Sequence, residues 1–227
     1  MKEQPTETEV KFCVRTPPPS LPQIRKYGNG NLQNILLRIW GRWLKAGGGW
    51  SLIQPRTFEV NLRFDTSKGD LMRAGRVLRL RKDDLVRLTY KDNSRQIKGA
   101  LTRREIEFVA NDFDSAKQFI EALGYEVVFI YEKYRTTFKY KGTQIMFDEL
   151  PYGNFVEIEG KLKSLRPIAE ELQLDWEKAI PASYHALFER LCKARGLKFR
   201  DLTFKNFKGI KVSPKDMMIE YADTSRS

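Results

Sequence analysis

Cysteine and histidine are scarce in this chain of 227 residues. Its two cysteines, Cys13 and Cys192, are too few for a disulfide framework and have no metal-binding spacing. This usage is typical of a protein from a reducing compartment. The single histidine, His185, has no Ser-His-Asp arrangement around it in the sequence and is expected to be an ordinary helix residue.

Long apolar runs are missing as well. No stretch approaches the 18 or so apolar residues of a membrane span, and the N-terminal sequence MKEQPTETE has no signal-peptide core. We therefore expect a cytoplasmic protein without a membrane partner. A hydrophobic content of 41% is ordinary for a globular chain long enough to bury a core.

Acidic residues are absent from one long segment and nearly absent from another. Residues 10–58 contain eight Lys or Arg and no acid, and residues 190–215 contain nine Lys or Arg with only Asp201. A basic excess this concentrated favours an anionic partner such as phosphate, polyphosphate or nucleic acid. Two solvated basic surfaces are the alternative.

The chain is predicted to be rich in short strands. Residues 15–22 carry three consecutive prolines, a loop follows at 27–31, and an amphipathic helix is expected over 32–46. Alternating apolar and polar residues predict a first strand at 6–12 and then strands at 50–65, 76–84, 85–92, 102–110, 126–140, 143–150 and 154–161. Helices are expected at 112–124, 164–174 and 181–196.

Charge lies on one face of these strands and apolar side chains on the other, because successive strand residues point to opposite faces. The aligned charged sets are Glu7, Glu9 and Lys11; Arg79 and Arg81; Arg87 and Lys91; Glu105 and Glu107; Lys133 and Arg135; and Glu157, Glu159 and Lys161. An open sheet with a wet face would carry more Ser, Thr, Gln and Asn. We therefore favour an α+β fold in which a closed antiparallel barrel encloses the charged faces and helices pack outside.

The chemistry of such an interior follows from its donors. Carboxylates without histidine or cysteine suit the hard cations Mg²⁺ or Mn²⁺. Clustered Arg and Lys suit phosphate oxygens. A site that holds both is suited to phosphoryl transfer.

The motif ETEVKF at 7–12 of the first strand resembles the E-x-E-x-K signature of the CYTH domain, the triphosphate tunnel metalloenzyme superfamily. The resemblance continues in family order through FEVNLRFDT, LRLRK, TYK, REIEF, EKYR, FDELPYGNFVEIEG and IPASYHALFERL, and spans about residues 6–195. It implies an eight-stranded triphosphate tunnel domain over residues 1–196, with an insertion at about 15–31, and a basic C-terminal extension over 197–227.

The resemblance also implies roles for particular residues. The expected metal ligands are Glu7, Glu9, Glu107, Glu157 and Glu159, with Glu105 and Asp148 as helpers. The expected triphosphate clamp is Lys11, Arg79, Arg81, Lys91, Lys133 and Arg135, and Lys11 and Glu107 are the expected catalytic residues. Structural ion pairs inside the tunnel are the alternative for any of these, and more so for Arg87, Glu105 and Lys161.

Several functions share this clamp. The first expectation is a Mg²⁺- or Mn²⁺-dependent phosphohydrolase acting on inorganic tripolyphosphate or an organic triphosphate such as thiamine triphosphate. The alternatives are a class IV adenylyl cyclase and a non-catalytic triphosphate- or polyphosphate-binding module. The basic tail is a candidate site for polyphosphate or nucleic acid, and a homodimer is also expected as a candidate assembly.

Overall fold

The computed structural model describes residues 6–15 and 49–223. Its strands are β1 (Thr6–Val14), β2 (Ser51–Asp65), β3 (Val77–Lys82), β4 (Val86–Ile97), β5 (Ala100–Ala110), β6 (Glu126–Tyr140), β7 (Thr143–Leu150) and β8 (Gly153–Glu159). Its α-helices are α3 (Asp70–Arg73), α4 (Phe113–Ala122), α5 (Leu162–Glu171) and α6 (Tyr184–Arg195), and short 3₁₀ turns cover Trp176–Lys178 and Pro214–Met217. The proline-rich insertion and the helix expected at 32–46 lie outside the described residues.

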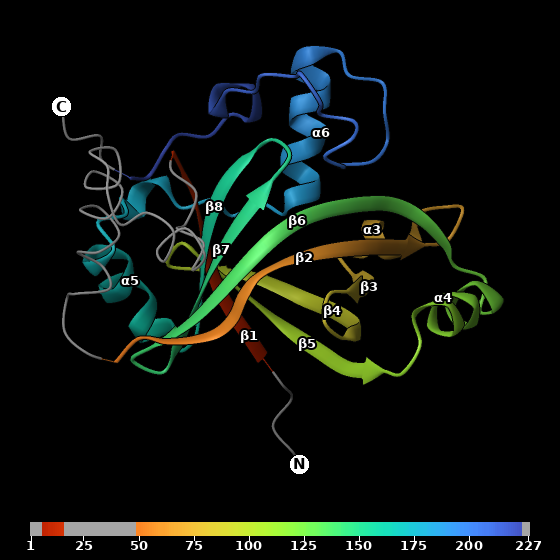
Figure 1. The fold of residues 1–227 in the computed structure, drawn as a ribbon, viewed down its shortest axis with the longest axis horizontal. Coiled ribbons are helices and arrows are strands. Elements are labelled where there is room, and N and C mark those ends of the chain that lie inside the picture. The colour runs from red at the N-terminus through yellow and green to blue at the C-terminus, as the bar shows by residue number, and fades with distance from the viewer. Residues whose placement is uncertain (1–5, 16–48, 224–227) are drawn as a thin grey trace, which may run out of the picture.

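The eight strands pair antiparallel into a closed ring in the order β1-β5-β4-β3-β2-β6-β7-β8 (Figure 1). The strand β1 closes the ring, because it pairs with β5 on one side and with β8 on the other. This confirms the closed eight-stranded antiparallel barrel expected from the alternating charge. Closure also satisfies the backbone groups that a sheet edge would leave unpaired.

Two helices cover the outer face of the ring, as expected. Helix α5 buries Leu165 and Ile168 in a cluster with the outward side chains Phe12 and Ile158. Helix α4 buries Ile120 against Leu80 and its neighbours. Each helix presents a stripe of apolar residues at helical spacing, and burial of that stripe stabilises both the helix and the barrel wall.

Helix α6 and the C-terminal segment instead lie over one end of the barrel. The inward-facing positions change from charged to apolar toward this end, from Lys11 to Cys13 on β1 and from Glu157 to Phe155 on β8. These apolar residues cluster with Leu187 of α6. The barrel interior is therefore charged in its middle and apolar beneath α6.

The basic tail packs onto this apolar end. Leu202 is fully buried and bridges to Tyr131 of β6, and Phe207 and Met217 join the same cluster. Further along, Tyr221 pairs with Cys13 of β1. The aromatic residues of the tail are thus used to hold it against the barrel.

Helix ends follow their sequence signals. The Asp112 side chain accepts a hydrogen bond from the Ser115 amide at the start of α4, and Ser183 accepts one from Ala186 at the start of α6. Gly196 ends α6 at a φ of 63°, a left-handed conformation that favours glycine. None of the helices in the described ranges is long and apolar enough to cross a lipid bilayer.

Candidate functional site

The barrel encloses a cavity of about 600 Å³. Its wall is built by the inward positions of the strands and by the first residues of α6. All eleven candidate site residues from the sequence line it: Glu7, Glu9, Lys11, Arg79, Arg81, Lys91, Glu107, Lys133, Arg135, Glu157 and Glu159. Glu105 and Arg87, for which a structural ion pair was the stronger alternative, line the cavity too.

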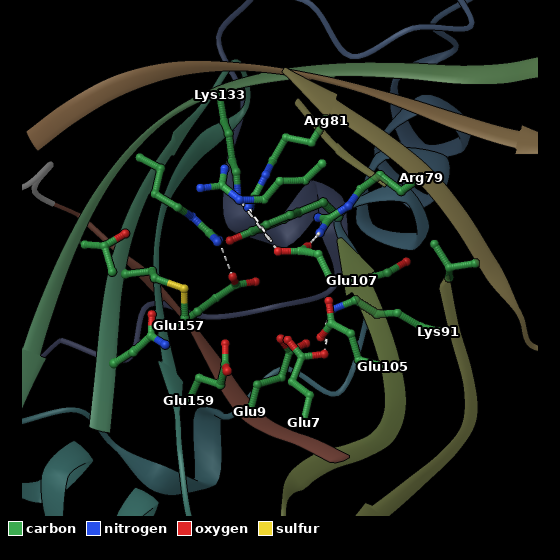
Figure 2. A pocket seen from close by; sticks show the side chains of 18 of the residues that line it. Glu7, Glu9, Arg79, Arg81, Lys91, Glu105, Glu107, Lys133, Glu157 and Glu159 are labelled. Carbon is green, nitrogen blue, oxygen red and sulfur yellow. Dashed lines mark hydrogen bonds and ion pairs between the residues drawn. The ribbon is translucent and has the colours of Figure 1, made fainter. Parts of the chain in front are cut away.

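The two charge types are partly segregated within the cavity (Figure 2). Glu7, Glu9, Glu105 and Glu159 gather on one side, from β1, β5 and β8. Arg79, Arg81 and Lys133 point in from the opposite wall, from β3 and β6. The register of the ring produces this division, because each strand carries a row of mostly one sign.

Ion pairs link several of these opposite charges. The Lys91 Nζ atom lies 2.5 Å from Glu7 and 3.1 Å from Glu105. The Lys11 Nζ atom lies 3.2 Å from Glu157. These carboxylates are therefore already engaged by cations of the expected clamp.

Glu107 lies among guanidinium groups. Its carboxylate oxygens are 3.7 Å from nitrogen atoms of Arg79, Arg81 and Arg87. It also accepts a hydrogen bond of 2.7 Å from the hydroxyl of Thr89. Figure 2 accordingly shows Glu107 apart from the Glu7, Glu9 and Glu159 group, on the arginine side.

Asp148 lies behind the cavity wall and fixes two of its cations. Its carboxylate is fully buried and accepts hydrogen bonds from Lys133 at 3.0 Å, from Arg135 at 2.6 Å and from the Tyr184 hydroxyl at 2.7 Å. A buried carboxylate with this many donors orients the side chains that it holds. Asp148 supports the wall and does not itself line the cavity.

Glu59 is a second buried counter-charge that the sequence did not reveal. It is fully buried, with oxygens 3.4 Å from Lys133 and 3.8 Å from Arg81. Burial alone would raise the pKa of Glu59, but the charges of Lys133, Arg135 and Arg81 lower it to about 2. Glu59 is thus ionised and stabilises the cationic wall.

Among the cavity residues that escaped the sequence reasoning are Arg63, Arg103 and Tyr131. For Arg103 and Tyr131 the signal was available, because each lies two positions from a recognised inward residue on its own strand. Arg103 is two residues before Glu105, and Tyr131 is two residues before Lys133. Arg103 contacts Glu9 at 2.8 Å, and the Tyr131 hydroxyl accepts a hydrogen bond from Arg79.

The expected alignment of Lys161 with Glu157 and Glu159 is wrong. Strand β8 ends at Glu159, and Lys161 is the residue before helix α5, beside a separate outer groove. The chain then turns into α5 through Gly160, which passes close to Thr143: a β-carbon there would lie 3.1 Å from the Thr143 hydroxyl. The alternation of inward and outward side chains along β8 therefore cannot be extended from Glu159 to Lys161.

A divalent cation fits the donor chemistry of the acidic side. The donors are carboxylate oxygens, which Mg²⁺ and Mn²⁺ prefer. Burial and the charges of Glu7 and Glu9 raise the pKa of Glu159 to about 7, so negative charge is in excess there. Within residues 6–15 and 49–223, however, no three Asp, Glu, His or Cys side chains converge into a formed metal site, and the ion pairs described above hold several of these carboxylates.

This raised pKa predicts a pH-dependent stability in metal-free protein. Glu159 ionises at about 4.5 when unfolded and about 7 when folded, so between these values the folded chain binds more protons. The free energy of unfolding should therefore fall as pH rises from 5 to 7, by up to about 3 kcal/mol. Urea unfolding with EDTA at pH 5, 6 and 7 measures this, and Glu159→Gln should flatten the dependence. An unchanged slope in the variant would contradict the assignment.

The chain matches the family model of the CYTH domain over residues 54–184. Solved structures share its fold at low sequence identity. A candidate adenylate cyclase from Vibrio parahaemolyticus matches with a TM-score of 0.61 and 19% identity, over 80% of this chain and 97% of its own. A protein from Pyrococcus horikoshii matches with a TM-score of 0.59 and 22% identity, over 83% and 99%.

A third structure carries a statement about activity. It is a candidate adenylyl cyclase from Hippeastrum, described as having a dominant triphosphatase activity, with a TM-score of 0.55 and 16% identity over 81% of this chain and 95% of its own. The comparison with curated protein sequences gives no significant match. Because the family model matches more than half of the chain, the chain belongs to the CYTH domain family.

Proposed function

We propose that the protein is a divalent-metal-dependent phosphohydrolase that acts on a triphosphate. The observation that carries this proposal is the single cavity with carboxylates on one side and Arg and Lys on the other (Figure 2). A site that only bound an anion would need the cations but not the acidic group. The reported triphosphatase activity of the Hippeastrum protein supports a hydrolase over a cyclase.

In this proposal the cations bind the phosphate chain. Arg79, Arg81, Lys91, Lys133 and Arg135 hold the phosphate oxygens, and their positions are fixed by Glu59, Asp148 and the other carboxylates. A preorganised set of cations stabilises the negative charge that develops on the transferred and leaving groups. Most of the catalysis then comes from positioning and electrostatics.

We assign the catalytic roles to Lys11 and Glu107. Lys11 lines the cavity near the start of α6, where its ammonium group contacts Glu157 and the Ala182 carbonyl. Glu107 faces the arginine wall and is oriented by the Thr89 hydroxyl. Water is the proposed nucleophile, and Glu107 is the carboxylate best placed beside the phosphate-binding arginines to orient it.

The proposed metal ligands are Glu7, Glu9, Glu107, Glu157 and Glu159. A bound Mg²⁺ or Mn²⁺ would neutralise phosphate charge and polarise the phosphoryl group. Because Lys91 and Lys11 now engage Glu7 and Glu157, phosphate oxygens that take over these cations would release the carboxylates for the metal. Metal and triphosphate should therefore strengthen each other's binding.

A substrate panel tests the proposal. The pure protein is incubated with Mg²⁺ or Mn²⁺ and tripolyphosphate, thiamine triphosphate, ATP or long-chain polyphosphate, and the products are resolved. Release of phosphate from a triphosphate is the expected result. Cyclic AMP as the product from ATP would indicate the cyclase, and binding without turnover would indicate a triphosphate-binding module.

Replacing Glu9 by Gln should lower kcat for tripolyphosphate about 100-fold at saturating Mg²⁺, because the amide is a weaker ligand for a hard cation. The fold should remain, since Glu9 contacts Arg103 in a pair that Glu7 also shares. Initial rates and thermal melts measure both effects. Glu170→Gln, on the exposed face of α5, is the control and should match the wild type. Unchanged turnover of Glu9→Gln would contradict the metal assignment.

The remaining expectations about partners and location stay predictions. They concern polyphosphate or nucleic acid at the basic tail, a second copy of the chain, and a cytoplasmic location. The division into a domain at 1–196 and an extension at 197–227 is likewise a proposal.

A further inference from the structure

Arg63 of β2 differs from the other cations that line the cavity. Eight of these nine Lys and Arg side chains lie within 4.0 Å of a described carboxylate: Lys11, Arg79, Arg81, Arg87, Lys91, Arg103, Lys133 and Arg135. Among residues 6–15 and 49–223, no carboxylate lies that close to Arg63. Outside those ranges the sequence contains one acidic side chain, Glu3.

The surroundings of Arg63 add positive charge. It is paired across the sheet with Arg79, and Arg103 is also close enough to act on it. Burial and the like charges of Arg79 and Arg103 lower the pKa of Arg63 and outweigh the opposite effects of Tyr131 and Asp65. A buried cation held beside other cations is unfavourable unless something anionic compensates it.

Neighbouring polar groups also lack partners within the described part of the chain. Asn61 is two residues before Arg63 on the same face of β2 and is fully buried, yet neither of its amide atoms has a hydrogen-bond partner there. The Nε atoms of Arg79 and Arg81 have no hydrogen-bond partner there either. Unsatisfied buried donors of this kind mark a place for water or a ligand.

Arg63 lies toward the end of the cavity covered by α6. Its register partner on β6 is Phe129, whose ring packs 4.3 Å from that of His185 in α6, and Arg63 acts on the charge of His185. Burial and Arg63 both lower the pKa of His185. His185 is therefore neutral at pH 7 and does not compete with Arg63 for an anion.

We propose that Arg63 binds the free terminal phosphoryl group of the substrate, so that the substrate lies with this end toward α6 and any organic group points the other way. The inference rests on the proposed function and adds the direction of the substrate in the cavity. An organic end beside Arg63 would leave the guanidinium uncompensated, whereas a terminal phosphoryl group supplies several anionic acceptors.

Direct binding tests this direction. Calorimetry with EDTA present, so that no turnover occurs, gives dissociation constants for tripolyphosphate, ATP and thiamine triphosphate with the wild type and with Arg63→Gln. Hydrogen bonds to charged groups contribute about 1.5–3 kcal/mol, so Arg63→Gln should raise the dissociation constant of tripolyphosphate about 10- to 100-fold. The binding of ATP and thiamine triphosphate should weaken by the same factor, because all three ligands share the terminal phosphoryl group.

Two further variants guard against a trivial loss of fold. Arg104→Gln removes a partly exposed arginine from the outer face of β5, where it pairs with Asp92, and should bind like the wild type. Arg63→Lys keeps the charge and should bind tripolyphosphate with an affinity between those of the wild type and Arg63→Gln. A loss in Arg63→Lys equal to that in Arg63→Gln would overturn the charge-based role.

The outcomes separate the two proposals. If the wild type neither binds a triphosphate here nor releases phosphate in the substrate panel, the proposed function fails and the inference fails with it. If the wild type binds tripolyphosphate and Arg63→Gln binds it equally well, only the role of Arg63 is overturned. If Arg63→Gln weakens the binding of tripolyphosphate but not that of ATP and thiamine triphosphate, the organic group lies beside Arg63 and the proposed direction is wrong.

Discussion

Replacing Asp148 by Asn should lower the free energy of unfolding by about 3–5 kcal/mol. The carboxylate is fully buried and compensates two buried cations, Lys133 and Arg135, while accepting the Tyr184 hydroxyl. The amide keeps the shape but removes the charge. Glu59 and Glu157 alone would then have to compensate both cations. Urea unfolding followed by circular dichroism at pH 7 measures the difference.

Glu149→Gln provides a matched control on the same strand. Glu149 is adjacent to Asp148 but points outward, where its carboxylate pairs with Arg56, whose side chain is 35% exposed. Ion pairs on the surface contribute about 0–1 kcal/mol. A loss below 1 kcal/mol in both variants would show that Asp148 is not the counter-charge on which Lys133 and Arg135 depend.

Truncating the chain after Gly196 should destabilise the protein by about 5 kcal/mol or more. The removed segment contains Leu202, Phe207 and Met217, which are at most 5% exposed and pack against the apolar end of the barrel. Burial of each such side chain contributes about 1.5–3 kcal/mol. The free energy of unfolding of a natural domain is about 5–15 kcal/mol in total, so the truncated chain should be largely unfolded by 37 °C. Thermal melts of both chains measure the effect.

This truncation would separate polymer binding by the tail from turnover in the tunnel only if the barrel kept its fold without the tail. The packing of the tail makes that separation impossible, since folding would be lost with the tail. Neutralising exposed lysines keeps the packing: Lys198, Lys205, Lys208 and Lys211 are all exposed. If the tail binds polyphosphate or RNA, the four Lys→Gln changes should reduce binding at low salt and flatten its salt dependence, without lowering the melting temperature. A truncated chain as stable as the wild type would contradict the structural role.

The barrel was predictable because its pattern is local. Strand β6 spans Glu126–Tyr140 and β7 spans Thr143–Leu150, the bounds expected from alternation and from the turn at Lys141-Gly142. The same alternation predicted which side chains face inward, because a closed barrel leaves only one interior for them. The position of all eleven candidate residues around one cavity follows from this.

What the sequence could not supply depends on contacts between distant strands. Glu59 was not recognised because its partners, Lys133 and Arg81, come from other strands and only the ring order brings them together. Helix α3 was missed because it is a single turn held by the Asp65 carboxylate, which accepts the amides of Leu71 and Met72. Its residues have too short a span to show helical periodicity.

The place of α6 was also beyond the sequence. Its apolar stripe fits an outer face and a barrel end equally well, and the stripe does not distinguish between them. The change of the inward positions from charged to apolar, at Cys13 on β1 and Phe155 on β8, was the available signal. This change can be interpreted only when the structure shows that Cys13 and Phe155 lie at the same end of the barrel.

The closing strand has a consequence for how the protein folds. Strand β1 is synthesised first, yet both of its neighbours come much later in the chain: Thr8 meets Thr102, which is 94 residues away, and Glu9 lies opposite Glu159. Such a topology has a high contact order and is typical of slow folding, because long loops must close, at an entropic cost, before β1 can form its contacts. During translation, the side of the cavity formed by Glu7, Glu9 and Lys11 cannot be completed until β8 has emerged from the ribosome. Formation of the cavity is therefore a late event in the folding of a nascent chain.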